Sequence, residues 1–425
     1  MFDWMSSNGK RALALLSKAL KIDVAYFVKG GFWLGSGYVS VAVMRLLLVI
    51  ILANLVSRDF YGQYQFVFAV ISTIMAFSLP GMDIAIGQSV ANGFNHSLID
   101  GTRSKLRWSL LGSIVSLGLA AFFKFIHYQS FWFVFIAIAV LFPFYSSFTS
   151  VIAYYRGKED FRRATIYNVL IVAVGTVPIL VMVFFVESLL AMVVSSLGLT
   201  VLVYLVLYFR TSRNVSSEQI DPGIVAYGRN LTFMTFLTYI APYVDRLIVA
   251  GVAGFEGLAI YSIAMAITLN LSVNGQLISI LLLPKLSRES PYHEQRIKKL
   301  FWWVCLLILF GIGIVILAIP WVISFLFADK YVASIPYAQI GAVYLAFFIP
   351  ATILRTYFQG RKKTKILYAY NLSIGIINLV LLGILAPLFG ILGAVISKVL
   401  LGFFGFVFLV VSFYMSETPV LNKNK

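Results

Sequence analysis

The chain has 425 residues, of which 61% are hydrophobic and 12% are charged, and its formal net charge is +17. Long apolar runs recur from Gly31 to Tyr414, and each is long enough to cross a hydrocarbon core of about 30 Å as a helix. This composition excludes a soluble globular protein and predicts an all-α membrane protein. The single cysteine, Cys305, excludes an internal disulfide and a cysteine metal site, and no GxxxxGK loop is present for ATP phosphates.

Residues 1–29 precede the first apolar run and are predicted to be a cytoplasmic segment. They carry five lysines or arginines around short apolar stretches and no small-residue cleavage site, which is unlike a cleaved signal peptide. The stretch KRALALLSKALK fits a basic amphipathic helix lying on the inner membrane surface, and it fits a solvated tail equally well.

Twelve membrane spans are predicted from the apolar runs. Six form an N-terminal lobe over residues 30–209, and six form a C-terminal lobe over residues 230–415. A cytoplasmic linker at 210–229 joins the lobes, and a cytoplasmic tail follows at 416–425. The predicted spans are 32–56, 64–90, 108–126, 131–155, 164–185, 188–209, 230–253, 257–283, 300–326, 333–357, 366–387 and 389–414.

The lysines and arginines outside these spans predict the orientation of the chain. With the N-terminus inside, only Arg58, Lys124 and Lys330 fall on the outer side, and the other flanking cations fall in inner loops and tails. The positive-inside rule therefore places both termini in the cytoplasm. Nucleic acid is not an expected partner.

The two predicted lobes resemble each other in sequence. YYRGKEDFRRATIYN at 154–168 matches YFQGRKKTKILYAYN at 357–371, and weaker matches occur in the same order elsewhere. Each lobe has an even number of spans, so both insert the same way round. The repeat is therefore predicted to be parallel, with the substrate path along the seam of two pseudo-symmetric bundles.

Six ionisable residues lie within the predicted spans. A charge at the middle of a bilayer costs about 2.5–3.5 kcal/mol, so such residues usually face the interior of a bundle or water. Cations outnumber acids, and a passage lined in this way would attract an anion; the arginine fork suits a pyrophosphate or a carboxylate. The residues are Arg45, Asp83, Asp245, Arg246, Arg355 and Lys398.

Their positions suggest different roles. Arg45 and Arg246 occupy corresponding positions in spans one and seven, and Lys398 lies deep in span twelve. Asp245 is predicted to be a counter-ion or a titrating group, with a structural Asp245–Arg246 pair as the alternative. Asp83 and Arg355 lie near the inner ends of their spans, where a role at the interface is an equal alternative.

The chain resembles the polysaccharide-export branch of the MOP superfamily, of which the nearest type is the Wzx-like O-antigen flippase. The resemblance is carried by FYGQYQFVFAVISTIMAFSLPGMDIAIGQSVA, YYRGKEDFRR, the aspartate–arginine pair in YVDRLIVAG and the ending APLFGILGAVISK. It covers essentially the whole chain and implies a MATE-like fold of two lobes. Relatives that flip the peptidoglycan precursor usually have two further spans, which this chain lacks.

The resemblance implies a transporter and not an enzyme. Such a protein would move an undecaprenyl-pyrophosphate-linked oligosaccharide from the cytoplasmic to the periplasmic leaflet of a bacterial inner membrane. It would work by alternating access through a cationic central cavity. Arg45, Arg246, Lys398 and Arg355 would bind the substrate, while Asp245 and Asp83 are candidates for coupling to a proton or sodium ion. No cofactor is expected. Membrane lipids, a polysaccharide polymerase and a chain-length regulator are the expected partners.

Three other functions are weighed against this one. A MATE-like cation or drug antiporter would need acids deep in the spans, where Asp245 alone qualifies. A glycan polymerase or ligase would need a large outer loop, and the outer loops here are short. A major-facilitator sugar transporter would carry its charged loop after span two, and DGTRSKLR resembles that loop only loosely.

Overall fold

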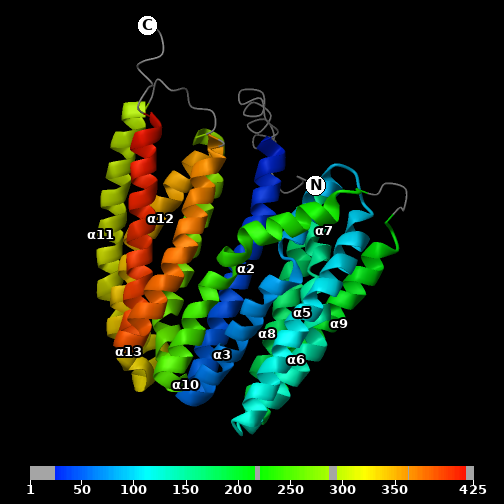
Figure 1. Ribbon diagram of the computed structural model, residues 1–425. Helices are drawn as coiled ribbons and strands as arrows, with labels where there is room; N and C mark the ends of the chain where they lie inside the picture. The colour runs from blue at the N-terminus through cyan, green and yellow to red at the C-terminus, as the bar shows by residue number, and fades with distance from the viewer. Residues whose placement is uncertain (1–23, 216–220, 287–293, 362, 418–425) are drawn as a thin grey trace, which may run out of the picture. The chain divides into compact units, whose positions relative to one another are not determined.

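The computed structural model describes residues 24–215, 221–286, 294–361 and 363–417 (Figure 1). The predicted interfacial helix in residues 1–23 lies outside these residues, as does the end of the cytoplasmic tail. Within them the chain is helical and contains no strand. The helices are α2 (Val24–Leu55), α3 (Arg58–Ile74), η1 (Met75–Ser78), α4 (Gly81–Ala91), α5 (Ser97–Phe125), α6 (Gln129–Ser147), α7 (Ser150–Gly157), α8 (Phe161–Phe185), α9 (Leu189–Ser212), α10 (Ile224–Leu286), α11 (Glu294–Phe327), η3 (Ala328–Ser334), α12 (Ile335–Gly360) and α13 (Thr364–Glu417).

Among the described residues, nine helical ranges are long and apolar enough to cross a membrane. Three of them, Ile224–Ser272, Phe301–Gly360 and Thr364–Met415, have 49, 60 and 52 residues, which is more than one crossing requires. Each of the three is interrupted where the sequence predicts a turn between two spans. The all-α membrane fold is therefore confirmed, while the count of twelve spans stays a prediction.

Two of these interruptions depend on a glycine. Gly254 in α10 has φ 70° and ψ −176°, and Gly390 in α13 has φ 60° and ψ −134°. This part of conformational space is open to glycine and costly for residues with a Cβ atom. The chain therefore turns at these two points between regular helical segments. Both lie at or beside a predicted boundary between spans.

The second predicted span, 64–90, is broken in the structure. It consists of α3, η1 and α4, with Leu79 and Pro80 between η1 and α4. Leu79 adopts a left-handed conformation with φ 56°. The ring of Pro80 disfavours the helical region for the preceding residue, which explains why the helix stops there.

The described chain forms two compact units (Figure 1). Unit 1 comprises residues 1–51 and 74–234, and unit 2 comprises residues 52–73 and 235–425. The antiparallel neighbours α5 and α6 pack along each other in unit 1, and α12 and α13 do so in unit 2. The boundaries of the two lobes drawn from the sequence remain a prediction.

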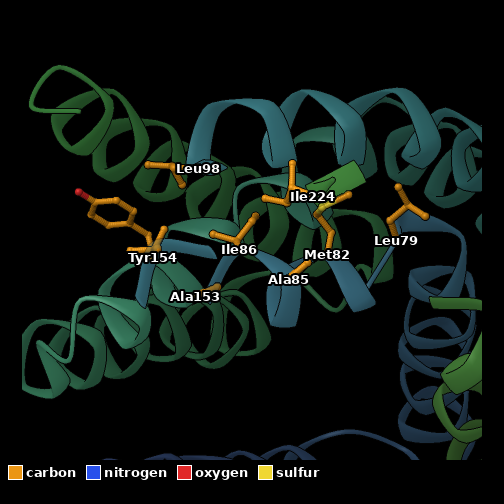
Figure 2. Close-up of a cluster of buried hydrophobic side chains, with 9 residues drawn as sticks. Leu79, Met82, Ala85, Ile86, Leu98, Ala153, Tyr154 and Ile224 are labelled. Carbon is orange, nitrogen blue, oxygen red and sulfur yellow. The ribbon is translucent and has the colours of Figure 1, made fainter. Parts of the chain in front are cut away.

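A core cluster in unit 1 joins α4 to α5, α7 and the start of α10 (Figure 2). Its members come from four separate stretches of the chain, so this cluster fixes α4 against three other helices. The beginning of α10 is held there by a hydrogen bond from the backbone N–H of Gly81 to Thr232 Oγ1, at 3.1 Å. The buried members are Leu79, Met82, Ala85, Ile86, Val90, Leu98, Ala153, Tyr154 and Ile224.

Lys330, one of the three cations predicted on the outer side, has a structural role in unit 2. Its Nζ atom donates hydrogen bonds to the carbonyl oxygens of Ala53 at 2.7 Å, of Asn54 at 3.2 Å and of Val56. These carbonyls lie at the C-terminal end of α2, where they lack helical partners and where a cation interacts favourably with the helix dipole. Asn54 Nδ2 donates in turn to the carbonyl of Leu326 at 2.8 Å.

Candidate functional site

Asp245 is the most enclosed acid within the predicted spans. Its side chain is buried in unit 2, where Lys398 Nζ lies 3.1 Å from Oδ2 and the hydroxyl of Tyr261 donates to the same oxygen at 2.6 Å. The backbone N–H of Arg246 donates to Oδ1 at 2.8 Å. Asp245 and Tyr261 lie on opposite sides of the Gly254 turn, and Lys398 lies beyond the Gly390 turn. The carboxylate therefore ties three helical segments together.

The counter-ion of Asp245 is thus Lys398, whose charge the carboxylate neutralises. No ion pair joins the side chains of Asp245 and Arg246, both of which lie within the described residues. Consecutive residues on a helix point in different directions, about 100° apart, so adjacency in sequence does not bring their side chains together. Asp245 and Arg246 therefore interact through the backbone N–H of Arg246, and their side-chain charges do not pair.

Arg246 is half-buried and, among the residues described, has no acidic partner. Its guanidinium is close enough to the hydroxyl groups of Tyr61 and Tyr261 to interact with them electrostatically. Tyr61 is fully buried and accepts a hydrogen bond from Gln65 Nε2 at 2.6 Å. In the described residues, the guanidinium of Arg246 therefore interacts with two tyrosine hydroxyl groups and pairs with no acid.

Arg355 lies on α12 of unit 2, half-buried beside two tyrosines. Its guanidinium interacts electrostatically with Tyr344 of α12 and Tyr370 of α13. The segment of α13 after Gly390 presents a glycine to each ring. A Cβ at Gly402 would lie 2.8 Å from Cδ2 of Tyr344 on α12, and a Cβ at Gly405 would lie 3.2 Å from Oη of Tyr370 in the earlier segment of α13. No acid pairs with Arg355 in the part of the chain described.

Arg45 lies on α2 in unit 1 and its side chain is exposed. The described residues provide it with no hydrogen bond or ion pair. Arg45, Arg246 and Arg355 therefore share the property of lacking an acidic partner, which separates them from Lys398.

Asp83 forms a second lysine pair, in unit 1. Lys105 Nζ lies 2.7 Å from Asp83 Oδ1 and donates to Thr149 Oγ1 at 2.5 Å, and that hydroxyl donates to Asp83 Oδ2 at 3.0 Å. The side chain of Lys105 is 1% exposed and that of Asp83 is 33% exposed. Both candidates for ion coupling, Asp83 and Asp245, therefore already hold a lysine ammonium.

The pairing of Lys105 was not predicted from the sequence, because hydropathy places Lys105 in an inner loop before a span at 108–126. In the structure α5 begins at Ser97, which places Lys105 inside the helix. A signal for this was present in the sequence. Small residues recur at helical spacing around the lysine, which is a pattern typical of close helix packing in membranes. The positions are Gly101, Lys105, Ser109, Gly112 and Ser116.

A metal centre finds no support in the described residues, where no three histidine, cysteine, aspartate or glutamate side chains lie close enough to hold an ion. Cys305 is buried in α11 and has no disulfide partner.

Residues 51–300 match the family described as polysaccharide biosynthesis protein. A multidrug resistance MATE family transporter of the MOP superfamily, in an inward-facing conformation, has a similar structure: the TM-score is 0.64 at 12% identity, over 89% of this chain and 96% of that one. The lipid II flippase MurJ, in an inward closed conformation, is similar with a TM-score of 0.62 at 15% identity, over 90% of this chain and 88% of that one. A MOP superfamily transporter from Pyrococcus furiosus is similar with a TM-score of 0.54 at 12% identity, over 94% of this chain and 96% of that one. No curated protein matches the chain.

These similarities define a multi-pass membrane protein with the fold that is seen in MOP-superfamily transporters. By the match over residues 51–300, the chain belongs to the polysaccharide biosynthesis protein family. Family and fold together confirm the resemblance to the polysaccharide-export branch that the sequence motifs indicate.

Proposed function

We propose that this protein is a flippase for an undecaprenyl-pyrophosphate-linked oligosaccharide, such as an O-antigen repeat unit. It would carry the headgroup from the cytoplasmic to the periplasmic leaflet of the bacterial inner membrane by alternating access. Both termini would lie in the cytoplasm. A polymerase and a chain-length regulator would act on the product.

One observation carries this proposal: Arg45 and Arg246, at corresponding positions of the sequence repeat, have no acidic partner in the described residues. An unpaired guanidinium within a span is costly, by about 2.5–3.5 kcal/mol on the insertion scale, unless water or an anion meets it. A pyrophosphate offers the oxygen atoms that the planar guanidinium fork binds in pairs. The family to which the chain belongs supports a polysaccharide substrate.

The lysine pairs weigh against the alternative, an antiporter for cations or drugs. Such a protein needs a deep acid that can receive its substrate, and Asp245 is 3.1 Å from Lys398 and also accepts the hydroxyl of Tyr261. A cationic substrate would have to displace a tethered ammonium from a buried carboxylate. The same holds for a coupling proton or sodium ion at Asp245 or Asp83.

The arginine roles can be tested by glycan export in cells that depend on this protein. We expect Arg45→Ala and Arg246→Ala each to reduce surface glycan at least about tenfold, because each removes charge-assisted hydrogen bonds to a phosphate. Membrane levels of both variants should match the wild type. Arg213→Ala removes an exposed cation outside the spans and should export normally. Full export by both arginine variants would refute the assigned roles.

The antiporter alternative has a separate readout. Cells expressing the protein should not extrude a cationic dye, and strong extrusion that is lost in Asp245→Asn would favour the antiporter. Dependence of glycan flipping on a sodium or proton gradient, measured in proteoliposomes, would show whether a coupling ion is used. Loss of that dependence in Asp245→Asn or Asp83→Asn would assign the residue.

A further inference from the structure

A small pocket opens in unit 1 where α2 passes the end of α7 and the beginning of α8. The helices approach closely because α2 has a glycine there: a Cβ at Gly37 would lie 2.6 Å from Thr165 Cγ2. Thr165 Oγ1 donates a hydrogen bond to the carbonyl of Trp33 at 3.1 Å, which fixes the two helices in register. The pocket is lined by Leu34, Gly37, Tyr38, Arg156, Ala164, Thr165 and Asn168.

Two polar side chains of this pocket are free to bind a ligand. Arg156 is exposed, and in the described residues its guanidinium has no ion pair or hydrogen bond. Asn168 is half-buried, and its side-chain amide likewise has no partner in that part of the chain. A guanidinium fork beside an amide donor can hold a phosphate through several hydrogen bonds.

The acids near Arg156 do not neutralise the pocket. Asp160 caps α8, where Oδ1 accepts the backbone N–H of Arg163 at 3.0 Å and Oδ2 lies 3.4 Å from Arg163 Nε. Glu159 is exposed and does not line the pocket. The motif RGKEDFRR therefore keeps an excess of positive charge at the mouth of the pocket.

The pocket lies at the level expected for lipid headgroups. Trp33 directly precedes Leu34, a residue of the pocket lining, and the guanidinium of Arg162 lies 5.6 Å from the Trp33 ring. Tryptophan is enriched at the membrane–water interface, and a guanidinium at this distance from its ring makes a cation–π interaction. The RGKEDFRR segment is one of the loops that the positive-inside rule assigns to the cytoplasm.

Arg45 lies deeper along the same helix. Tyr38 lines the pocket, and Arg45 follows it by seven residues, which is two turns and about 10 Å of helix. Residues at this spacing lie on nearly the same face. A headgroup held at Arg156 could therefore pass along the Tyr38 face of α2 to Arg45 without leaving unit 1.

We propose that the Arg156–Asn168 pocket is a capture site for the phosphorylated headgroup of the carrier lipid, occupied in the cytoplasmic leaflet before the headgroup reaches Arg45. The inference rests on the proposed function and adds a second site to it. Arg156 sets the affinity of loading, whereas Arg45 acts in translocation.

Binding to purified full-length protein in detergent tests the site. The probe is undecaprenyl pyrophosphate without sugar, titrated and followed by native mass spectrometry. Arg156→Gln should weaken its binding about tenfold or more, since it removes a charge-assisted contact, and Asn168→Leu should weaken it less. Lys158→Gln removes the same charge from the same segment but does not line the pocket, and it should bind like the wild type.

Four outcomes would overturn the proposal. Unchanged binding by Arg156→Gln would show that the pocket is not used, and an equal loss in Lys158→Gln would show a diffuse effect of charge. Equal binding of phosphatidylglycerol, or of inorganic pyrophosphate, would show a site for bulk anionic lipid or for soluble phosphate.

Flipping kinetics in proteoliposomes separate this inference from the proposed function. Arg156→Gln should raise the half-saturating concentration of lipid-linked oligosaccharide and leave the maximal rate nearly unchanged, whereas Arg45→Gln should lower the maximal rate. Wild-type protein that does not flip this substrate would refute the proposed function. Wild-type flipping with unaltered kinetics in Arg156→Gln would refute the capture site alone.

Discussion

In the described residues, a buried lysine pairs with an aspartate in each of the two units, and the two pairs differ in their access to water. In unit 1, Lys105 is 1% exposed while Asp83 is 33% exposed, so the acid reaches solvent. In unit 2, Lys398 and Asp245 are 11% and 5% exposed, and both oxygens of the carboxylate accept hydrogen bonds. Losing one partner therefore has different consequences in the two units.

The comparison teaches that a cation inside a span is not by itself a substrate ligand. Lys398 and Lys105 are both neutralised, whereas Arg45 and Arg246 meet no acid in the described residues. Charge close to the middle of a bilayer needs a partner, and when the fold does not supply one, a substrate or water must.

The largest effect is expected in unit 2. Lys398→Met keeps the volume but leaves Asp245 as a buried charge without its counter-ion, which should cost about 3–5 kcal/mol of stability. Asp245→Asn should cost a similar amount by stranding the ammonium. Thermal unfolding of the protein in detergent would measure both. The double variant should recover most of the loss, and a double variant as unstable as either single one would contradict the pairing.

Unit 1 should respond asymmetrically. Asp83→Asn strands a lysine that has almost no access to water, with an expected cost of about 3–5 kcal/mol. Lys105→Met leaves a carboxylate that solvent can hydrate, with an expected cost of about 1–3 kcal/mol. The same unfolding measurement compares the two variants. Equal losses would show that the difference in exposure does not decide the energetics.

Residues with positive φ occur in both units, some of them glycines and some with a Cβ atom. Unit 2 turns at Gly254 and Gly390, so Gly254→Ala and Gly390→Ala should each cost about 1–3 kcal/mol. Gly251→Ala is the matched control, because it lies within the same helix with open space around it. It should stabilise the protein by about 0.5–1 kcal/mol. A loss as large in the control would show that the positive φ of Gly254 and Gly390 is not the cause of the cost.

The smallest effect is expected at a turn of unit 1 that does without glycine. Glu159 has a left-handed φ of 57° in the connection between α7 and α8. Because this conformation costs a residue with a Cβ atom about 1–2 kcal/mol, Glu159→Gly should be neutral or slightly stabilising in the same unfolding measurement. A clear loss of stability would mean that the Glu159 side chain has a role of its own.

The sequence by itself determined the class of the fold and most of its helical segments. Apolar runs long enough to span a bilayer allow only helices, because backbone groups in lipid must be satisfied within the segment. The boundaries predicted near 253–257 and 387–389 coincide with the Gly254 and Gly390 turns. Motifs spread over the whole chain were enough to indicate the family.

Only the tertiary structure decided which charges pair. Asp245 lies next to Arg246 in sequence but binds Lys398, because neighbouring side chains on a helix point apart and the packing of α13 brings the lysine to the carboxylate. The place of Lys105 inside a helix was not predicted, because a hydropathy pattern ends a span at a charged residue. In the structure the charge is stabilised by Asp83 and Thr149, which lie beside it. Partner choice depends on which helices pack together, and a local pattern of residues does not contain that information.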